Sequence, residues 1–195
     1  RTASRQRKPF SFIYFGDAQR EVKSQWSRVI RQAYKHASDA RFVIHAGDLI
    51  DRHNRDAQWG EWFNAGGWLN GMLPSIPAVG NHEYGSDESG TRHLSTHWRP
   101  QFTLPMHGPK GLEETAYYVD YQGVRVVVLN TNEQLEKQVA WLDGVLADNP
   151  QHWTVLTFHH PIFSAAAGRD NADLRALWMP IIDRYEVDLV LQGHD

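Results

Sequence analysis

The sequence predicts an α/β domain built on a largely parallel sheet. Two observations carry this prediction: short buried strands alternate with amphipathic helices along the 195 residues, and polar residues directly follow several of the strands. At 41% hydrophobic and 22% charged residues, a chain of this length buries a core of its own. Since it has no Cys, disulfide scaffolds and thiolate zinc sites are excluded.

The first elements are read from short apolar runs and helical spacing. Residues 1–9 (RTASRQRKP) are basic and lack an apolar period, so we expect a linker there and a folded domain over 10–195. The run FSFIYF at 10–15 predicts a strand that ends at Gly16-Asp17. An apolar residue every three or four positions predicts a helix over about 20–38.

The middle of the chain continues the alternation and then loses it. Strands are expected at 42–45 and 76–79, and a helix broken by two glycines at about 56–73. From 84 to 115 the apolar period disappears, which predicts a long loop. Its residues His93, His97, Trp98 and Arg99 suit either a substrate lid or a plain surface loop.

The last third begins with a hairpin signal, Gln122-Gly123, between strands at 116–121 and 124–129. A helix over 135–146, a strand at 154–158, a helix over 174–185 and a strand at 188–192 complete the domain.

Charge and hydropathy narrow the partners. A net charge of -3, from 20 basic and 23 acidic residues, leaves no broad basic surface for nucleic acid or anionic lipid. The longest apolar runs are far shorter than the ~20 residues that span a bilayer, so no membrane segment is expected. The eleven His residues are the unusual feature, because imidazole is the commonest metal ligand in proteins.

Polar side chains gather at the ends of five predicted strands. Each lies within about two residues of a strand's carboxyl end, where open α/β sheets bind ligands. Carboxylate, amide and imidazole ligands suit Mn, Fe or Zn ions, and the lack of thiolates favours a hydrolytic site over a structural one. Each motif alone is ordinary, but five in order are not; the residues are Asp17, Asp48, Asn81, His159 and His194.

The blocks around these residues, FGDAQ, AGDLIDR, VGNHEY, TFHHPIF and QGHD, resemble the signature of the calcineurin-like metallophosphoesterase family over 10–195. Flanking sequence such as YYVDYQGVRVVVLNTN looks closest to the purple-acid-phosphatase-like branch. The resemblance implies a four-layer α/β/β/α sandwich with two mixed sheets and two divalent metal ions. It implies that Asp48 bridges the two ions, that Asp17 serves the first, and that the second takes Asn81, His159 and His194.

Three departures from the family pattern stand out. Gln19 replaces a His that commonly ligates the first metal, so it either ligates more weakly or only hydrogen-bonds near the site. Asp51 stands where purple enzymes carry a tyrosine ligand, so an iron(III) chromophore is not expected. The final motif also lacks its second His, which would follow Asp195, so the catalytic domain is expected to be truncated at the C-terminus.

The remaining motif residues receive roles through the same resemblance. His82 is the candidate general acid, and Asp51 would orient it. Arg52 matches a phosphate-binding Arg, and an ordinary surface Arg is the alternative. His159 is preferred over His160 as the metal ligand, because family members use the His two residues before Pro.

The function implied is hydrolysis of phosphomonoesters or small phosphodiesters by attack of a hydroxide that bridges two metal ions. The expected partner is a small phosphorylated substrate, with no membrane and no nucleic acid. Two alternatives stay open: a metal-poor, non-catalytic binding or scaffold protein of the same fold, and a family nuclease. A periplasmic or secreted location is expected if the branch resemblance holds and a signal lies upstream.

Overall fold

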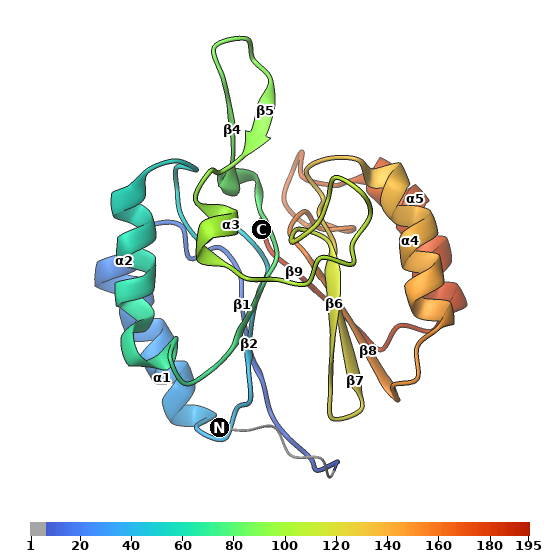
Figure 1. Ribbon diagram of the computed structural model, residues 1–195, viewed down its shortest axis with the longest axis horizontal. Coiled ribbons are helices and arrows are strands. Elements are labelled where there is room, and N and C mark those ends of the chain that lie inside the picture. Colours follow the sequence, from blue (N-terminus) through green and yellow to red (C-terminus); the bar gives the residue numbers. More distant parts are fainter. Residues whose placement is uncertain (1–6) are drawn as a thin grey trace.

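The computed structural model describes residues 7–195, and their helices and strands form four layers, α/β/β/α (Figure 1). In chain order the elements are β1 (Ile13–Phe15), η1 (Val22–Trp26), α1 (Ser27–His36), β2 (Val43–His45), α2 (Asp56–Gly66), η2 (Gly67–Leu69), β3 (Ser75–Pro77), η3 (Asn81–Glu83), β4 (Tyr84–Ser86), β5 (Arg92–Leu94), α3 (Trp98–Gln101), β6 (Tyr117–Tyr121), β7 (Val124–Val128), α4 (Leu135–Ala147), β8 (Trp153–Phe158), α5 (Ala172–Arg184) and β9 (Leu189–Gln192).

The first sheet has the order β1-β2-β3, and all three strands are parallel. Ile44 in the middle strand pairs with Tyr14 on one side and Ile76 on the other. Helices α1 and α2 cover its outer face, where Trp26 and Trp62 belong to one buried cluster. Parallel strands in this layer follow from helical crossovers, as the alternating pattern predicts.

The second sheet has the order β6-β7-β8-β9 and is mixed. Strands β6 and β7 are antiparallel, as the hairpin signal at Gln122-Gly123 predicts, and β8 and β9 join them in parallel. Helices α4 and α5 cover the outer face, with Leu142 and Trp178 fully buried against it. Of the two sheets expected to be mixed, the second is mixed, while the described strands of the first are parallel throughout.

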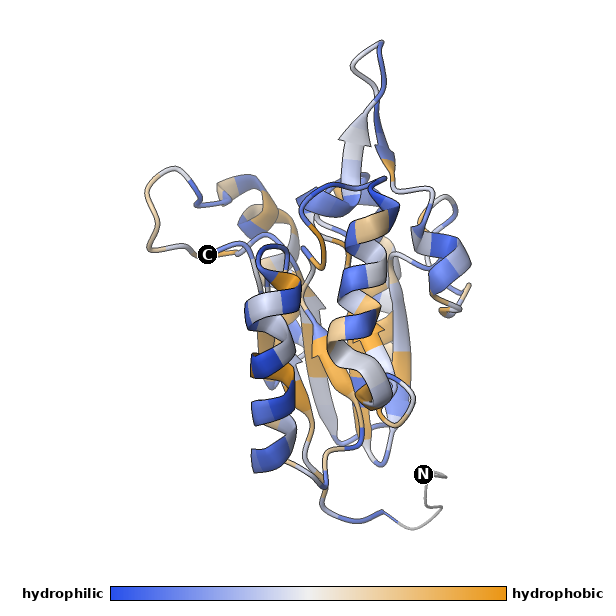
Figure 2. Cartoon of the chain, turned by 90° about the vertical axis from the view of Figure 1, so that its left-hand side faces the viewer, coloured by the Kyte–Doolittle hydropathy of each residue, from blue (hydrophilic) through white to orange (hydrophobic). Residues whose placement is uncertain are grey.

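The two sheets pack face to face around a third buried cluster. Ile44 and Ala78 from the first sheet meet Tyr117, Val126 and Val128 from the second. Figure 2 shows the hydrophobic colours concentrated on the strands, behind helices whose outer surfaces are hydrophilic. This arrangement confirms the expected four-layer sandwich.

Two expectations concern irregular segments, the linker at residues 1–9 and the long loop at residues 84–115. Of the expected linker, residues 1–6 lie outside the described part, and Arg7, Lys8 and Pro9 are exposed without helix or strand. The expected loop at 84–115 contains the β4–β5 hairpin and helix α3. No hairpin is predicted here, because its strands show no apolar alternation. Its turn is closed instead by Asp87, which accepts hydrogen bonds from the backbone N–H groups of Ser89 and Thr91.

The carboxyl ends of the parallel strands in both sheets lie at one end of the molecule, from which the β4–β5 hairpin projects (Figure 1). No helix in the described part of the chain is long and apolar enough to span a membrane.

Candidate metal centre

The five strand-end side chains predicted to converge do so at this end of the molecule. Asp17 follows β1, Asp48 follows β2 and Asn81 follows β3, all in the first sheet. His159 and His194 follow β8 and β9 in the second sheet. The centre therefore lies across the junction of the two sheets, with each sheet supplying part of the ligand set.

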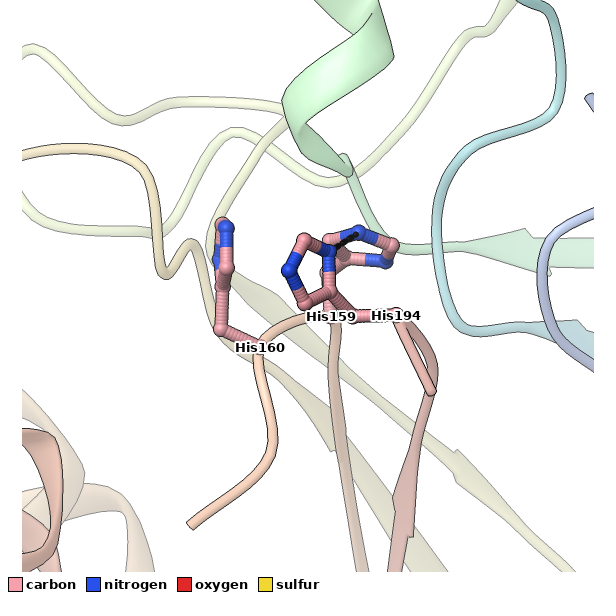
Figure 3. Close-up of side chains that lie close together, drawn as sticks. All are labelled: His159, His160 and His194. Atoms are coloured by element: carbon pink, nitrogen blue, oxygen red, sulfur yellow. Dashed lines mark hydrogen bonds between the residues drawn. The ribbon is translucent and has the colours of Figure 1, made fainter. Parts of the chain in front are cut away.

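His159 is the middle of the cluster and is fully buried. Its Nδ1 donates to the carbonyl oxygen of Ala46 at 2.8 Å, which turns Nε2 toward the other side chains. Nε2 lies 3.0 Å from Asn81 Oδ1, 3.1 Å from His194 Nδ1 and 3.2 Å from Asp48 Oδ2 (Figure 3 shows the histidines). Asn81 Oδ1 and Asp48 Oδ2 are acceptors, and an imidazole nitrogen that carries no proton is a metal ligand, so the donor set of this second site fits a divalent cation.

The pKa values of Asp48 and His159 also favour positive charge at this site. Burial acts to raise the pKa of Asp48, but the hydrogen bond and charge of His159 outweigh it and the pKa is lowered. Burial acts to lower the pKa of His159, but Asp48 outweighs it and the pKa is raised. The buried carboxylate is thus held ionised and favours positive charge beside it.

The first site, for which Asp17, Gln19 and Asp48 are the predicted ligands, is less closed. Asp17, Asp48 and His159 each offer a ligand atom within 4.8 Å of the others, and Asp17 Oδ2 accepts the backbone N–H of His194 at 2.8 Å. Burial raises the pKa of Asp17. Gln19 donates its backbone N–H to the carbonyl of Asp48 at 3.0 Å, and among the described residues its buried Oε1 has no hydrogen-bond partner. An orphaned acceptor at this position fits a weak cation ligand.

Tight backbone turns place the carboxylates. Asp17 and Asp48 both have positive φ, 47° and 53°, so the Gly-Asp pairs form left-handed turns that reverse the chain over the strand ends. Gly47, at φ 88°, leaves no room for a side chain, because a Cβ there would lie 2.7 Å from Gly80 N. A Cβ on Gly193 would lie 2.6 Å from the carbonyl of Ala46.

Glu83 belongs to the centre, although no role for it is predicted from the sequence. Its fully buried carboxylate accepts backbone N–H groups from Gly80 at 2.7 Å, Asp48 at 2.9 Å and Leu49 at 2.7 Å. Burial and the charge of Asp48 raise its pKa to about 7. The carboxylate ties the turn after β2 to the turn after β3, so it fixes two ligand-bearing segments at once.

His82 faces the centre from the turn that carries Asn81. Its Nδ1 donates to the backbone carbonyl of Asp51 at 2.6 Å, whereas the Asp51 carboxylate is 3.8 Å away. His82 Nε2 lies 3.9 Å from Asp48 Oδ2 and is therefore on the side of the metal ligands. The main chain of Asp51, rather than the carboxylate expected from the resemblance, is the closer orienting group.

Arg52 and His160 lie beside the ligand cluster. Arg52 is exposed, with its Nε 3.8 Å from an Asp51 carboxylate oxygen, so its phosphate role stays a prediction. His160 Nδ1 is 2.7 Å from Thr131 Oγ1, and burial followed by the charges of His159 and His194 lowers the pKa of His160 to about 3. His159, His160 and His194 each offer a ligand atom within 4.8 Å of the others, so the choice of His159 over His160 as the metal ligand stays a prediction.

Relatives of known sequence resemble this chain over all or most of its length. An uncharacterized protein of Mycobacterium tuberculosis strain H37Rv is 28% identical over 234 residues, which cover 100% of this chain and 44% of that protein. Purple acid phosphatase 23 of Arabidopsis thaliana is 24% identical over 155 residues, 75% of this chain and 33% of the plant protein. The chain thus spans less than half the length of these curated relatives.

Solved structures share the fold. Purple acid phosphatase PPD1 from yellow lupin seeds superposes with a TM-score of 0.76 at 22% identity, covering 99% of this chain and 38% of that one. GAP50, the anchor in the inner membrane complex of Plasmodium, gives 0.65 at 16% identity, covering 94% and 65%. The profile of the calcineurin-like phosphoesterases matches residues 10–195. With the fold, the strand-end ligands and this match in agreement, the chain belongs to the calcineurin-like phosphoesterase family.

Proposed function

We propose that this domain hydrolyses phosphomonoesters or small phosphodiesters with the help of two divalent metal ions. The observation that carries the proposal is the convergence of Asp48, Asn81 and His194 on the Nε2 atom of His159, with His82 facing the same cluster. Its family is one of metal-dependent phosphoesterases, which supports the general reaction class.

Bound divalent ions would lower the pKa of a water molecule and neutralise the phosphoryl oxygens. Asp48 is placed to serve both sites, because it belongs to the group with Asp17 and its Oδ2 lies 3.2 Å from His159 Nε2. The turns that carry these carboxylates are fixed by Glu83 and by close glycine packing, so the ligand set is rigid before any ion binds.

His82 is proposed to protonate the leaving oxygen of the substrate. Because its Nδ1 is committed to the carbonyl of Asp51, Nε2 is the nitrogen that can deliver a proton on the metal side. In the overall reaction the P–O bond to the alcohol breaks, the oxygen of water joins phosphorus, and a proton ends on the alcohol oxygen.

The second candidate function, a metal-poor binding protein, is favoured by one observation, Gln19 in place of a stronger ligand. GAP50, which shares the fold, is described as the anchor in the inner membrane complex of Plasmodium. The intact ligand set around His159 favours the enzyme.

The test is an assay of the intact protein with Mn²⁺ on a chromogenic phosphomonoester and a chromogenic phosphodiester. We expect turnover that a chelator abolishes, and loss of both metal binding and turnover in Asp48→Ala. His82→Ala should keep metal binding and lose turnover. A folded protein that binds metal but hydrolyses neither ester with any divalent ion would sink the enzyme proposal in favour of the binding protein.

A further inference from the structure

A groove lined mainly by polar and charged residues lies between η1–α1 and α2, and we call it the α1–α2 groove. It consists of two hollows of about 740 and 280 Å³, and Lys23 and Glu61 line both of them. Together they have the size of sites that hold small organic ligands. The two helices that form its walls lie on the outer side of the first sheet (Figures 1 and 2).

The inner end of the groove adjoins the residues that handle the leaving group. Asp51 lines the larger hollow, and its main-chain carbonyl holds His82. Gln19, two residues after Asp17, lines the same hollow. With the leaving oxygen at His82, an alcohol that reaches past Asp51 would enter this groove.

The walls offer little to an aromatic or strongly anionic alcohol. Among the described residues that line the two hollows, Val22 and Ala65 are the hydrophobic ones and none is aromatic, so no ring can stack there. Positive and negative side chains balance, Arg20, Lys23 and Arg31 against Glu21, Asp51 and Glu61. A polyanion therefore gains little net attraction from the groove.

Lys23 and Glu61 give the groove its recognition chemistry. Neither side chain forms an ion pair within 4.0 Å in the described part of the structure, so an ammonium donor and a carboxylate acceptor face a ligand that enters. Gln58 Oε1 is taken by the backbone N–H of Arg52 at 2.8 Å, which leaves its amide N–H groups as donors. A hydroxyl group can accept from Lys23 and donate to Glu61 at once.

We propose that the α1–α2 groove binds the alcohol part of the substrate and selects hydroxyl-rich alcohols, that is, polyols or sugars. This rests on the proposed function and deepens it, because hydrolysis would release the hydroxyl-rich alcohol into the groove with its oxygen protonated. The substrate class follows from the presence of both hydrogen-bond donors and acceptors on a groove whose charged side chains balance.

The experiment compares three esters of six-carbon alcohols in the intact protein with Mn²⁺: sorbitol 6-phosphate, glucose 6-phosphate and hexyl phosphate. The first two distinguish an open-chain polyol from a ring sugar, and the third lacks the extra hydroxyl groups. We expect kcat/KM to favour at least one hydroxylated ester over hexyl phosphate. Lys23→Met and Glu61→Gln should each lower that ratio by about tenfold, the size of one charge-assisted hydrogen bond.

Matched controls are Lys35→Met, on the same helix as Arg31 but outside the groove, and Glu136→Gln on α4, both exposed. Both should keep the wild-type ratio. If the Lys23 and Glu61 variants also keep it, or if the wild type prefers hexyl phosphate, the inference is wrong.

Calorimetric binding of the same esters separates this inference from the proposed function. Suppose that the protein hydrolyses none of the esters but binds a hydroxylated ester more tightly than hexyl phosphate, and that the two groove variants weaken this binding. That result supports the inference about the groove and overturns the proposed enzymatic function. Turnover of all three esters without any effect of the groove variants supports the enzyme and overturns the groove.

Discussion

Because the main chain of Asp51 holds His82, we predict that substitutions at these two positions lower kcat to very different extents. No side-chain change at position 51 removes the carbonyl that accepts from His82 Nδ1 at 2.6 Å. The carboxylate, 3.8 Å away, shares a partly exposed setting with the imidazole, their side chains being 28% and 27% exposed. A pair of this kind contributes about 1 kcal/mol or less, which corresponds to at most about fivefold in kcat.

His82→Ala, by contrast, removes the proton donor itself. General acid catalysis contributes roughly 10²- to 10⁴-fold, or about 3–5 kcal/mol of barrier. We therefore expect Asp51→Asn to lower kcat by less than about fivefold and His82→Ala by at least about a hundredfold. The gap between the two is large enough to be measured without ambiguity.

The assay is kcat with Mn²⁺ on an aryl phosphate and an alkyl phosphate. The aryl alcohol leaves readily without a proton, so His82→Ala should be more harmful on the alkyl ester, whereas Asp51→Asn should affect both esters equally. Metal content and thermal unfolding of each variant serve as controls for folding. If Asp51→Asn loses as much activity as His82→Ala, and loses it mainly on the alkyl ester, the carboxylate orients His82 and the reasoning from the carbonyl is refuted.

Two further predictions concern the metal centre, and a third concerns the buried network of Arg125 near the start of β7. Gly193→Ala should weaken Mn²⁺ binding by at least about tenfold in a calorimetric titration, because the new methyl group would lie 2.9 Å from His159 Nδ1 and displace that ring; wild-type affinity would contradict this. Arg125→Met should lower the free energy of unfolding in urea by about 2–4 kcal/mol, since it removes a buried guanidinium bonded to both Asp120 carboxylate oxygens and to two main-chain carbonyls; a loss below 1 kcal/mol would show that the network is dispensable. Metal removal should lower the same free energy, by about 2.7 kcal/mol relative to protein with Mn²⁺ at a hundred times its Kd; an equal unfolding curve with and without the ion would mean that the centre does not bind it in the folded state.

The sequence was sufficient to place the ligands but not to orient them. Parallel strands bring their carboxyl ends together, so polar residues after β1, β2, β3, β8 and β9 had to meet at one end of the sheets. The role of Glu83 depends on contacts with Asp48 and Leu49, 35 and 34 residues away, which no local pattern contains. A visible signal did exist, because an acid three residues after Gly80 can accept that residue's N–H, but nothing in the sequence says that the second turn shares it.

The short hairpin at residues 84–94 shows a different reason for failure. Its strands are three residues long and stand away from the core, so neither hydrophobic alternation nor length marks them. Helix α1 was predicted, but the π-helical turn before it, which follows Glu21 at φ 51°, was not. That turn lies on the wall of the α1–α2 groove, in keeping with the concentration of such irregular turns at functional sites.

The two positions where this chain departs from the resemblance within its described site, Gln19 and Asp51, both line the inner hollow of the α1–α2 groove. The weaker ligation of the first metal site and the space for the substrate's alcohol therefore depend on the same part of the fold. Gln19→His should raise Mn²⁺ affinity by about tenfold, because imidazole is a stronger ligand than a neutral amide oxygen. The same change draws the side chain from the groove wall toward the ion, so it should also lower the preference for sorbitol 6-phosphate over hexyl phosphate. If Gln19→His raises the metal affinity, measured by calorimetry, and lowers the alcohol selectivity, measured by kcat/KM, then the departures at Gln19 and Asp51 serve one function. A gain in affinity with unchanged selectivity would show that Gln19 serves the metal centre alone.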